Sequence, residues 1–196
     1  MLPSSSQEFV RTFSAVLLVL AALCATAGLA RAQDDDAKPA KGISAGGKWM
    51  EYDSEDKMTA AKRVRFDLEA DAPLRGSDAK PKVLIFCTNG KFSLGDFRPN
   101  VRMSPPNRPG FWGQPQMEVR TRVDDTPNHH GWNWVNGKFL AMDKGTVREM
   151  IGAKLFRIEF VSASGPQIAE FSPLGLDLSR VKNACGITPK RPEKPE

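Results

Sequence analysis

The sequence is poor in the residues that most often carry catalysis or bind metals. It has three cysteines, two histidines and one tyrosine among 196 residues. It contains no G-x-S-x-G nucleophile elbow and no glycine-rich phosphate loop leading into a helix. The sequence therefore offers no nucleophile or phosphate-loop motif, and we expect no cofactor.

The two histidines, His129 and His130, are adjacent and follow Asp124 and Asp125. Imidazole near carboxylates is common in zinc sites and hydrolases, so a His-dependent metal-binding hydrolase is one alternative function. Neighbouring side chains on an extended segment point to opposite faces, however, and the spacing offers no third ligand. We interpret the segment as a turn marked by Pro127, Asn128 and Gly131, and predict neither a metal site nor a catalytic residue.

An excess of one sign of charge is also lacking. The formal net charge is +5, from 28 Lys and Arg against 23 Asp and Glu, and the basic residues are interleaved with acids. A nucleic-acid-binding domain would show a basic stripe or an aromatic RNA-binding motif, and neither is present. We therefore expect no nucleic-acid partner.

No apolar run is long enough to cross a membrane. The longest, Val16 to Leu23, is well short of the about 20 residues that a span needs. The A-x-A pattern of Ala30-Arg31-Ala32 predicts a signal peptide over residues 1–32, cleaved after Ala32. Lipid attachment at Cys24 is disfavoured because Leu23 occupies a position that needs a small residue. We expect a periplasmic or secreted protein, with no membrane span after cleavage.

Cleavage would leave Cys87 and Cys185 as the only cysteines. In an oxidising compartment two cysteines usually form one structural disulfide, so we predict a Cys87–Cys185 bridge. The alternative is a pair of buried free thiols.

The remaining chain reads mainly as β-strands. Val83 to Phe86 is an apolar run typical of a central strand, and Asn89-Gly90 follows it with the residues of a type I′ hairpin turn. A second such turn is predicted at Asn136-Gly137 and a third hairpin at Ser164-Gly165-Pro166. Clean alternation of apolar and charged residues predicts strands over 63–70 and 117–124.

Two short helices complete the prediction. Thr146 and Glu149 have capping-box spacing, with Val147, Met150 and Ile151 on one face. Near the C-terminus Leu178, Val181 and Cys185 repeat on one helical face, with Asp177 or Ser172 as the cap and Gly186 as the terminator. The fold class is all-β, sandwich-like, with about eight mostly antiparallel strands and two short helices, one of them C-terminal. A sandwich is favoured over a closed barrel.

The domain boundaries follow from composition. Residues 33–46 are polar and small and predict a flexible leader. Residues 47–187 form a single β-rich domain of ordinary size. Residues 188–196, rich in Lys and Pro, predict a disordered tail.

The stretch Pro99–Gln116 is long and proline-rich, and loops of this length in compact domains are usually functional or disordered. It presents Phe111 and Trp112 with Arg102 and Arg108, the residue types that dominate binding surfaces. We predict a partner-binding loop, against the alternative of a solvated connector. Trp132 and Trp134 share a strand face, which favours core packing over a ligand platform.

Several short motifs together resemble the VasI-type family of proteins associated with type VI secretion. They span residues 47–187 in order: Gly47-Lys-Trp49, Asp56-Lys-Met-Thr59, Pro81-Lys-Val-Leu-Ile-Phe-Cys87 with Asn89-Gly90, Val119-Arg-Thr-Arg-Val-Asp-Asp125, the Trp134 hairpin, Ala169-Glu-Phe171 and Val181-Lys-Asn-Ala-Cys185-Gly186.

The resemblance implies a non-enzymatic periplasmic accessory protein in which Cys87 and Cys185 form the bridge. Its partner would be a protein or a cell-envelope component. The Pro99–Gln116 loop and the His129-His130 segment depart from the family pattern. The alternative function is a stand-alone secreted binding or inhibitory module.

Overall fold

The computed structural model describes residues 41–190. The predicted signal peptide, most of the leader and residues 191–196 of the tail lie outside the described residues. The strands are β1 (Ile43–Gly46), β2 (Trp49–Glu55), β3 (Lys62–Glu69), β4 (Lys82–Thr88), β5 (Lys91–Arg98), β6 (Arg108–Pro109), β7 (Pro115–Val123), β8 (Thr126–Val135), β9 (Phe139–Met142), β10 (Phe156–Ser162) and β11 (Gly165–Phe171). The helices are α2 (Lys144–Met150) and α3 (Leu178–Cys185), with a 3₁₀ turn η2 (Phe111–Gly113).

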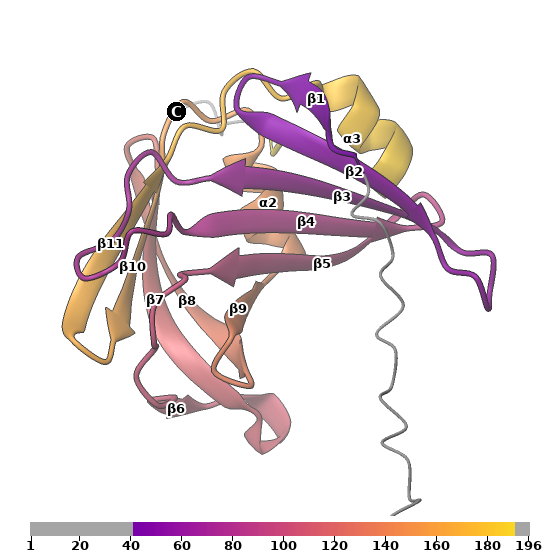
Figure 1. The fold of residues 1–196 in the computed structure, drawn as a ribbon. Coiled ribbons are helices and arrows are strands. Elements are labelled where there is room, and N and C mark those ends of the chain that lie inside the picture. Colours follow the sequence, from indigo (N-terminus) through magenta and orange to yellow (C-terminus); the bar gives the residue numbers. More distant parts are fainter. Residues whose placement is uncertain (1–40, 191–196) are drawn as a thin grey trace, which may run out of the picture. The chain divides into compact units, whose positions relative to one another are not determined.

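All the strands belong to one open antiparallel sheet. Its order is β1-β2-β3-β4-β5-β9-β8-β7-β10-β11, and β6 pairs with the start of β7. The sheet has two halves, β1–β5 and β7–β11, joined where β5 pairs with β9 through three residue pairs, Gly95 with Met142, Asp96 with Ala141 and Phe97 with Leu140. Figure 1 shows the strands of the two halves running at a steep angle to each other.

The core lies between the inner faces of the two halves. The ring of Phe97 on β5 lies 5.2 Å from that of Phe160 on β10 and 6.2 Å from that of Phe171 on β11. Those strands are not neighbours of β5 in the sheet, so the sheet must curl for the rings to meet. The Trp49 indole N–H also donates to the carbonyl oxygen of Pro173 at 2.8 Å, which ties the first half to the end of the second.

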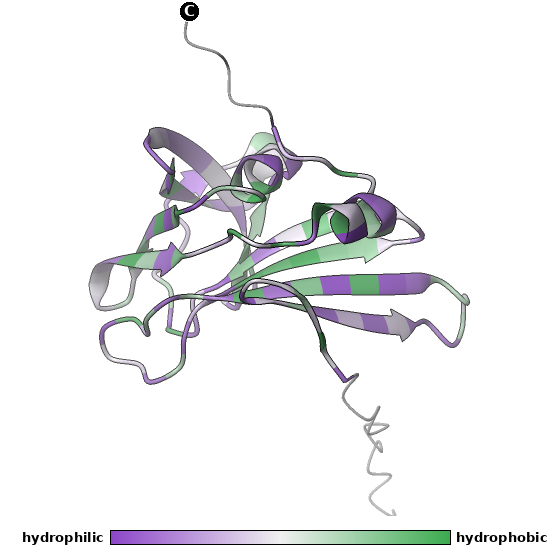
Figure 2. Cartoon of the chain, turned by 90° about the horizontal axis from the view of Figure 1, so that it is seen from above, coloured by the Kyte–Doolittle hydropathy of each residue, from purple (hydrophilic) through white to green (hydrophobic). Residues whose placement is uncertain are grey.

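The predicted fold class is confirmed, with one sheet whose two halves face each other in the manner of a sandwich. Asn89 and Gly90 have φ of 50° and 76°, and Asn136 and Gly137 have φ of 50° and 67°, as type I′ turns require. β4 is central, between β3 and β5. Figure 2 shows hydrophobic residues alternating with hydrophilic ones along the strands below α3.

The ordered chain begins earlier than predicted. Residues 43–46 of the predicted leader form β1, which pairs with β2, and Ala45 is buried. Composition could not indicate this, because the contacts are distant in sequence. The backbone of Gly46 lies so close to Gly175 that a Cβ on Gly46 would stand 2.2 Å from the Gly175 carbonyl oxygen. The Asp177 N–H also donates to the Ala45 carbonyl oxygen.

The strand count was also too low, because the prediction omitted β1 and the short β6. In addition, residues 126–131 are strand β8 rather than a turn. β9 pairs only with residues 133–135 of β8, so the start of β8 is an edge on that side. An edge tolerates Pro127, which lacks an N–H.

Both helices are present, with two corrections. α2 is capped by Asp143, whose carboxylate accepts a hydrogen bond from the Thr146 N–H at 2.8 Å; Thr146 lies inside the first turn and is not the cap. In α3 the Asp177 cap, the buried Val181 and Cys185 and the left-handed Gly186 agree with the prediction. Leu178, predicted on the buried face, is the first residue of the helix and is 41% exposed.

Candidate functional site

The two cysteines lie at disulfide distance. Cys87 on β4 and Cys185 at the end of α3 have Cα atoms 5.0 Å apart, and both are buried. α3 packs against β4 and β5, so the pair joins the C-terminal helix to the central strand. The alternative of two separate buried thiols therefore has no support in this geometry.

The residues predicted to bind a partner include two highly exposed aromatic side chains. Phe111 is 79% exposed and Trp112 is 87% exposed, in the η2 turn between β6 and β7. Their rings pack edge to face with centroids 4.9 Å apart. We call residues 110–113 the aromatic tip. Trp112 has a φ of 67°, a conformation that L-residues rarely adopt, and Gly113 follows it with a φ of 70°.

The base of the aromatic tip is fixed by hydrogen bonds. Asn107 N–H donates to Gln116 O, Gly110 N–H donates to Gln114 O, and Glu118 N–H donates to the Asn107 side chain. The Gln116 side-chain amide donates to Asn133 on β8 at 2.9 Å. The tip therefore projects from a hairpin and is not the end of a free loop.

Arg108 belongs to this hairpin. Its side chain lies across Gly131 of β8. A Cβ on Gly131 would stand 3.1 Å from a guanidinium nitrogen of Arg108 and 2.6 Å from the side-chain oxygen of Gln116. Gly131, expected to mark a turn, thus makes room for the side chains that support the tip. A larger residue there would displace them.

Arg102 lies apart from the aromatic tip, on a segment fastened to β10. Ala163 N–H donates to the Arg102 carbonyl, Ser104 N–H donates to Val161, and Met103 is buried and bridges to Ser162. Much of the predicted loop Pro99–Gln116 is therefore bound to the sheet, and the projecting part is short. The Arg102 side chain is nevertheless exposed.

The two histidines point to opposite faces of β8, as predicted. His129 is exposed on the outer face, opposite Arg120 in register. His130 faces inward and stacks on Trp132 with centroids 5.6 Å apart. The two side chains do not share a site.

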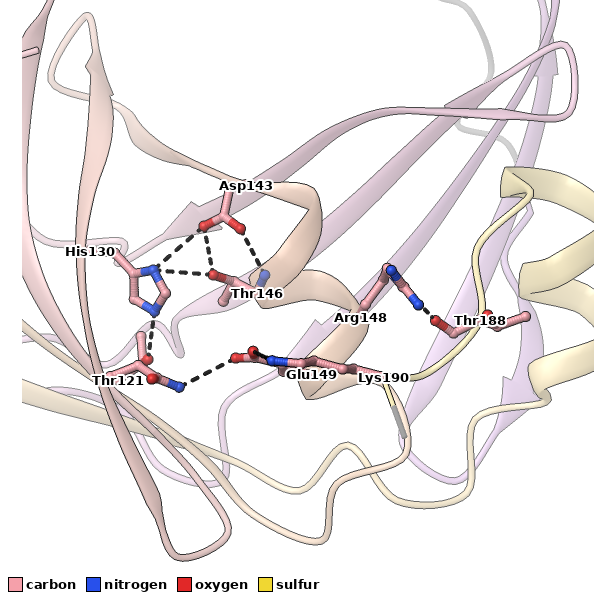
Figure 3. Close-up of polar contacts among 9 residues, drawn as sticks. Thr121, His130, Asp143, Thr146, Arg148, Glu149, Thr188 and Lys190 are labelled. Carbon is pink, nitrogen blue, oxygen red and sulfur yellow. Dashed lines mark hydrogen bonds and ion pairs between the residues drawn. The ribbon is translucent and has the colours of Figure 1, made fainter. Parts of the chain in front are cut away.

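His130 is part of a polar cluster that sequence reasoning missed, shown in Figure 3. Its Nε2 lies 3.0 Å from the Thr121 hydroxyl on β7, and its Nδ1 lies 3.5 Å from the Asp143 carboxylate. The Thr146 hydroxyl also donates to Asp143 at 2.6 Å. Burial raises the pKa of Asp143, but the hydrogen bonds from Thr146 and the charge of His130 outweigh it, so the pKa is lowered.

A hydroxyl, an imidazole and a carboxylate in a chain can in principle activate a nucleophile. Here the hydroxyl belongs to Thr121, which is 3% exposed, so a substrate has no access to it. The contacts instead join β7, β8 and the N-terminus of α2. No pattern in the sequence signals this cluster, because its members lie on three separate elements.

The start of the predicted tail is fastened beside this cluster. The Lys190 N–H donates to the Arg148 carbonyl at 2.7 Å, the Arg148 guanidinium donates to Thr188 O at 3.0 Å, and Lys190 pairs with Glu149 (Figure 3). Residues 188–190 are therefore ordered against α2, which corrects the predicted boundary of the tail.

A hollow of about 500 Å³ lies on the outer face of β7, β8, β10 and β11. Its arginines are paired, Arg120 with Glu159 and Arg157 with Glu170. Arg122 pairs with Asp125 nearby. Because each arginine already has a carboxylate, the hollow offers no unbalanced charge, and we assign it no ligand.

Two buried carboxylates lie on the outer face of the first half. Asp67 on β3 and Asp96 on β5 flank Leu84 in register. The Arg65 Nε donates to Asp67 at 2.7 Å, and the Arg98 Nε donates to Asp96 at 2.9 Å. Burial raises the pKa of both carboxyl groups, and the arginines oppose this shift only in part.

Within residues 41–190, no three His, Cys, Asp or Glu side chains gather in a way that could hold a metal ion. The same part of the chain has no helix that is long and apolar enough to cross a membrane. Comparisons with family models, curated proteins and solved structures find no match for this chain. What the structure defines is an antiparallel β protein with a cysteine-linked C-terminal helix and an exposed aromatic tip.

Proposed function

We propose that this is an exported, non-enzymatic accessory protein that acts by contact with a protein or a cell-envelope component. The observation that carries the proposal is the aromatic tip. Phe111 and Trp112 are almost fully exposed, although burying such rings is strongly favourable. Exposed aromatic residues beside an arginine are typical of the energetic centres of binding surfaces.

The rigidity of the hairpin supports the same proposal. Pro109 and Pro115 fix backbone angles on either side of the tip and pair with each other in register. A pre-organised turn loses little conformational entropy when it binds. The predicted export and the resemblance to VasI-type proteins support a contact in the periplasm or outside the cell. The bridge between Cys87 and Cys185 suits that compartment.

The test replaces both rings, Phe111→Ala with Trp112→Ala, and measures partner capture by the exported protein from envelope extracts. We expect the variant to fold and to capture less of the partners that the unchanged protein retains. Met58→Ala is the matched control, because Met58 is 94% exposed at the turn between β2 and β3. Equal capture by the folded double variant would show that the tip is not the interface.

The type VI part of the proposal has a separate test. A gene lying among type VI secretion genes supports it, whereas a gene with no such neighbours favours the stand-alone secreted module. Neither result alters the role proposed for the tip.

A further inference from the structure

The strand registers bring three connections to one end of the second half of the sheet. Gln116, at the start of β7, pairs with Asn133 near the end of β8, and Glu159 of β10 lies opposite Arg120 further along β7. The aromatic tip, the β8–β9 turn and the β10–β11 turn therefore lie at the same end, at the bottom of this half in Figure 1. We call this the cationic end, formed by residues 99–117, 132–142 and 160–169.

The charge at this end is mainly positive. None of the three ranges contains Asp or Glu, whereas they carry Arg102, Arg108 and Lys138, all exposed. Within residues 41–190 none of these three cations takes part in an ion pair. The neighbouring loop, residues 70–81, contains Asp71 and Asp78 as well as Arg75 and Lys80, so it adds no net charge, and Asp71 pairs with Lys48.

The acids of the second half lie elsewhere along the same strands. Asp124 and Asp125 form the turn between β7 and β8, at the opposite end. Glu118 is the acid that lies nearest to the tip: it is opposite Gly131, across which Arg108 lies, at the border of this end. The sheet is therefore polarised along its strands, although the charges are interleaved in the sequence.

Tryptophan and phenylalanine at a protruding tip, with cations on the connections at the same end of the sheet, match the interface of an anionic bilayer. Aromatic rings are favoured at the level of the lipid headgroups, and basic residues are attracted to anionic lipids. A single apolar anchor binds membranes only marginally, so stable docking takes a second, basic signal. This end has both an apolar anchor, the aromatic tip, and basic residues.

The size of the tip favours a lipid surface over a protein. A stable protein interface buries about 800 Å² on each partner. The two rings supply about 150–250 Å² each, on a narrow hairpin. A headgroup layer closes around a small projection, whereas a protein partner would need a broader face.

We propose that the cationic end docks on the surface of an anionic lipid bilayer, with Phe111 and Trp112 entering the headgroup region. Arg102, Arg108 and Lys138 then face the anionic headgroups. This inference rests on the proposed function and specifies the partner of the same tip. The bilayer is contacted from one side and is not crossed.

The experiment measures co-sedimentation of the exported protein, purified from the periplasm or the culture medium, with two kinds of vesicle. One contains phosphatidylethanolamine with phosphatidylglycerol, and the other contains phosphatidylcholine alone. We expect binding to the anionic vesicles, weaker binding to the neutral ones, and loss of binding as salt screens the cations.

Variants separate the two contributions. Phe111→Ala with Trp112→Ala should weaken binding to the anionic vesicles at least about tenfold, given the apolar area lost. Arg102→Gln and Arg108→Gln should each weaken it about fivefold. Met58→Ala should bind as the unchanged protein does. Urea unfolding of every variant checks that the fold is kept.

Tryptophan fluorescence gives a readout of insertion. Trp49 and Trp132 are buried and Trp134 is partly buried against the core, whereas Trp112 is 87% exposed, so a blue shift on binding vesicles reports mainly on Trp112. The variant Trp112→Phe should still sediment with anionic vesicles but lose most of the blue shift. Retention of the full shift would place the tip away from the lipid.

The inference is overturned if the protein does not sediment with anionic vesicles, or if the double alanine variant sediments equally well. If vesicles are not bound but the double variant still loses partners from envelope extracts, the partner is a protein and only this inference fails. If the variant also captures those partners normally, the proposed function fails as well.

Discussion

Removal of the Cys87–Cys185 bridge should lower the stability of the protein more than any other change considered. The two cysteines are 98 residues apart in sequence. In the chain-entropy model a disulfide that closes a loop of about 100 residues destabilises the unfolded state by about 4.7 kcal/mol at 25 °C. Strain or residual structure in the unfolded chain reduces this value, so it is an upper figure for the paired replacement Cys87→Ala with Cys185→Ala.

The assay is urea unfolding of the oxidised protein, the reduced protein and the double variant. The free energy of unfolding should fall by about 2–5 kcal/mol in both altered forms. The dependence on urea should become steeper, because an unfolded chain without the cross-link exposes more surface. Peptide mapping that recovers both cysteines as free thiols in the protein purified without reductant would refute the reasoning. A double variant within about 0.5 kcal/mol of the unchanged protein would do the same.

Two other predictions concern carboxylates. Asp143→Ala should destabilise the protein by about 1 kcal/mol at neutral pH, because α2 loses its cap. Because the pKa of Asp143 is lowered, its contribution to the free energy of unfolding is present above the ordinary pKa of 3.8 and is lost as the pH falls through the folded-state pKa. The difference in stability between the variant and the unchanged protein, measured by urea unfolding, should therefore shrink in acid. A difference that persists at the acid limit would contradict the capping role. For Asp96 the pH dependence has the opposite sign. Its pKa is raised in the folded state, so the folded state binds more protons than the unfolded state, and stability should fall as the pH rises from 3.8 through the folded-state pKa. Asp96→Asn should flatten that part of the pH profile, and an unchanged slope would show that burial does not set the titration of this group.

Local patterns predicted the elements whose contacts are close in sequence. The apolar run of β4, the alternation of β7 and the two Asn-Gly turns each depend on neighbouring residues, and each is present. The Asp177 cap and Gly186 terminator of α3 belong to the same class. Such signals act over a few residues, so the sequence displays them directly.

Features that depend on distant contacts were not predictable in the same way. β1 pairs with β2, and the turn that joins them, at Gly46 and Gly47, packs closely against Gly175, far along the chain. The cap of α2 was misassigned because Asp143 and Thr146 are both good capping residues, and the choice depends on where the backbone enters the helix. For the candidate site, Phe111, Trp112 and Arg108 were predicted from residue type, whereas the contribution of Lys138 depends on strand register.

The seam between β5 and β9 has a consequence for association between copies of the chain. A sheet made of two halves joined by three residue pairs could exchange halves between two molecules, since each half is built largely from its own hairpins. The second half carries α3 at its end, and Cys185 of that helix is joined to Cys87 in the first half. An exchanged half would have to leave α3 behind or break the bridge. Oxidation therefore opposes domain swapping at this seam, because a bridged molecule can exchange its second half together with α3 only after the bridge is broken.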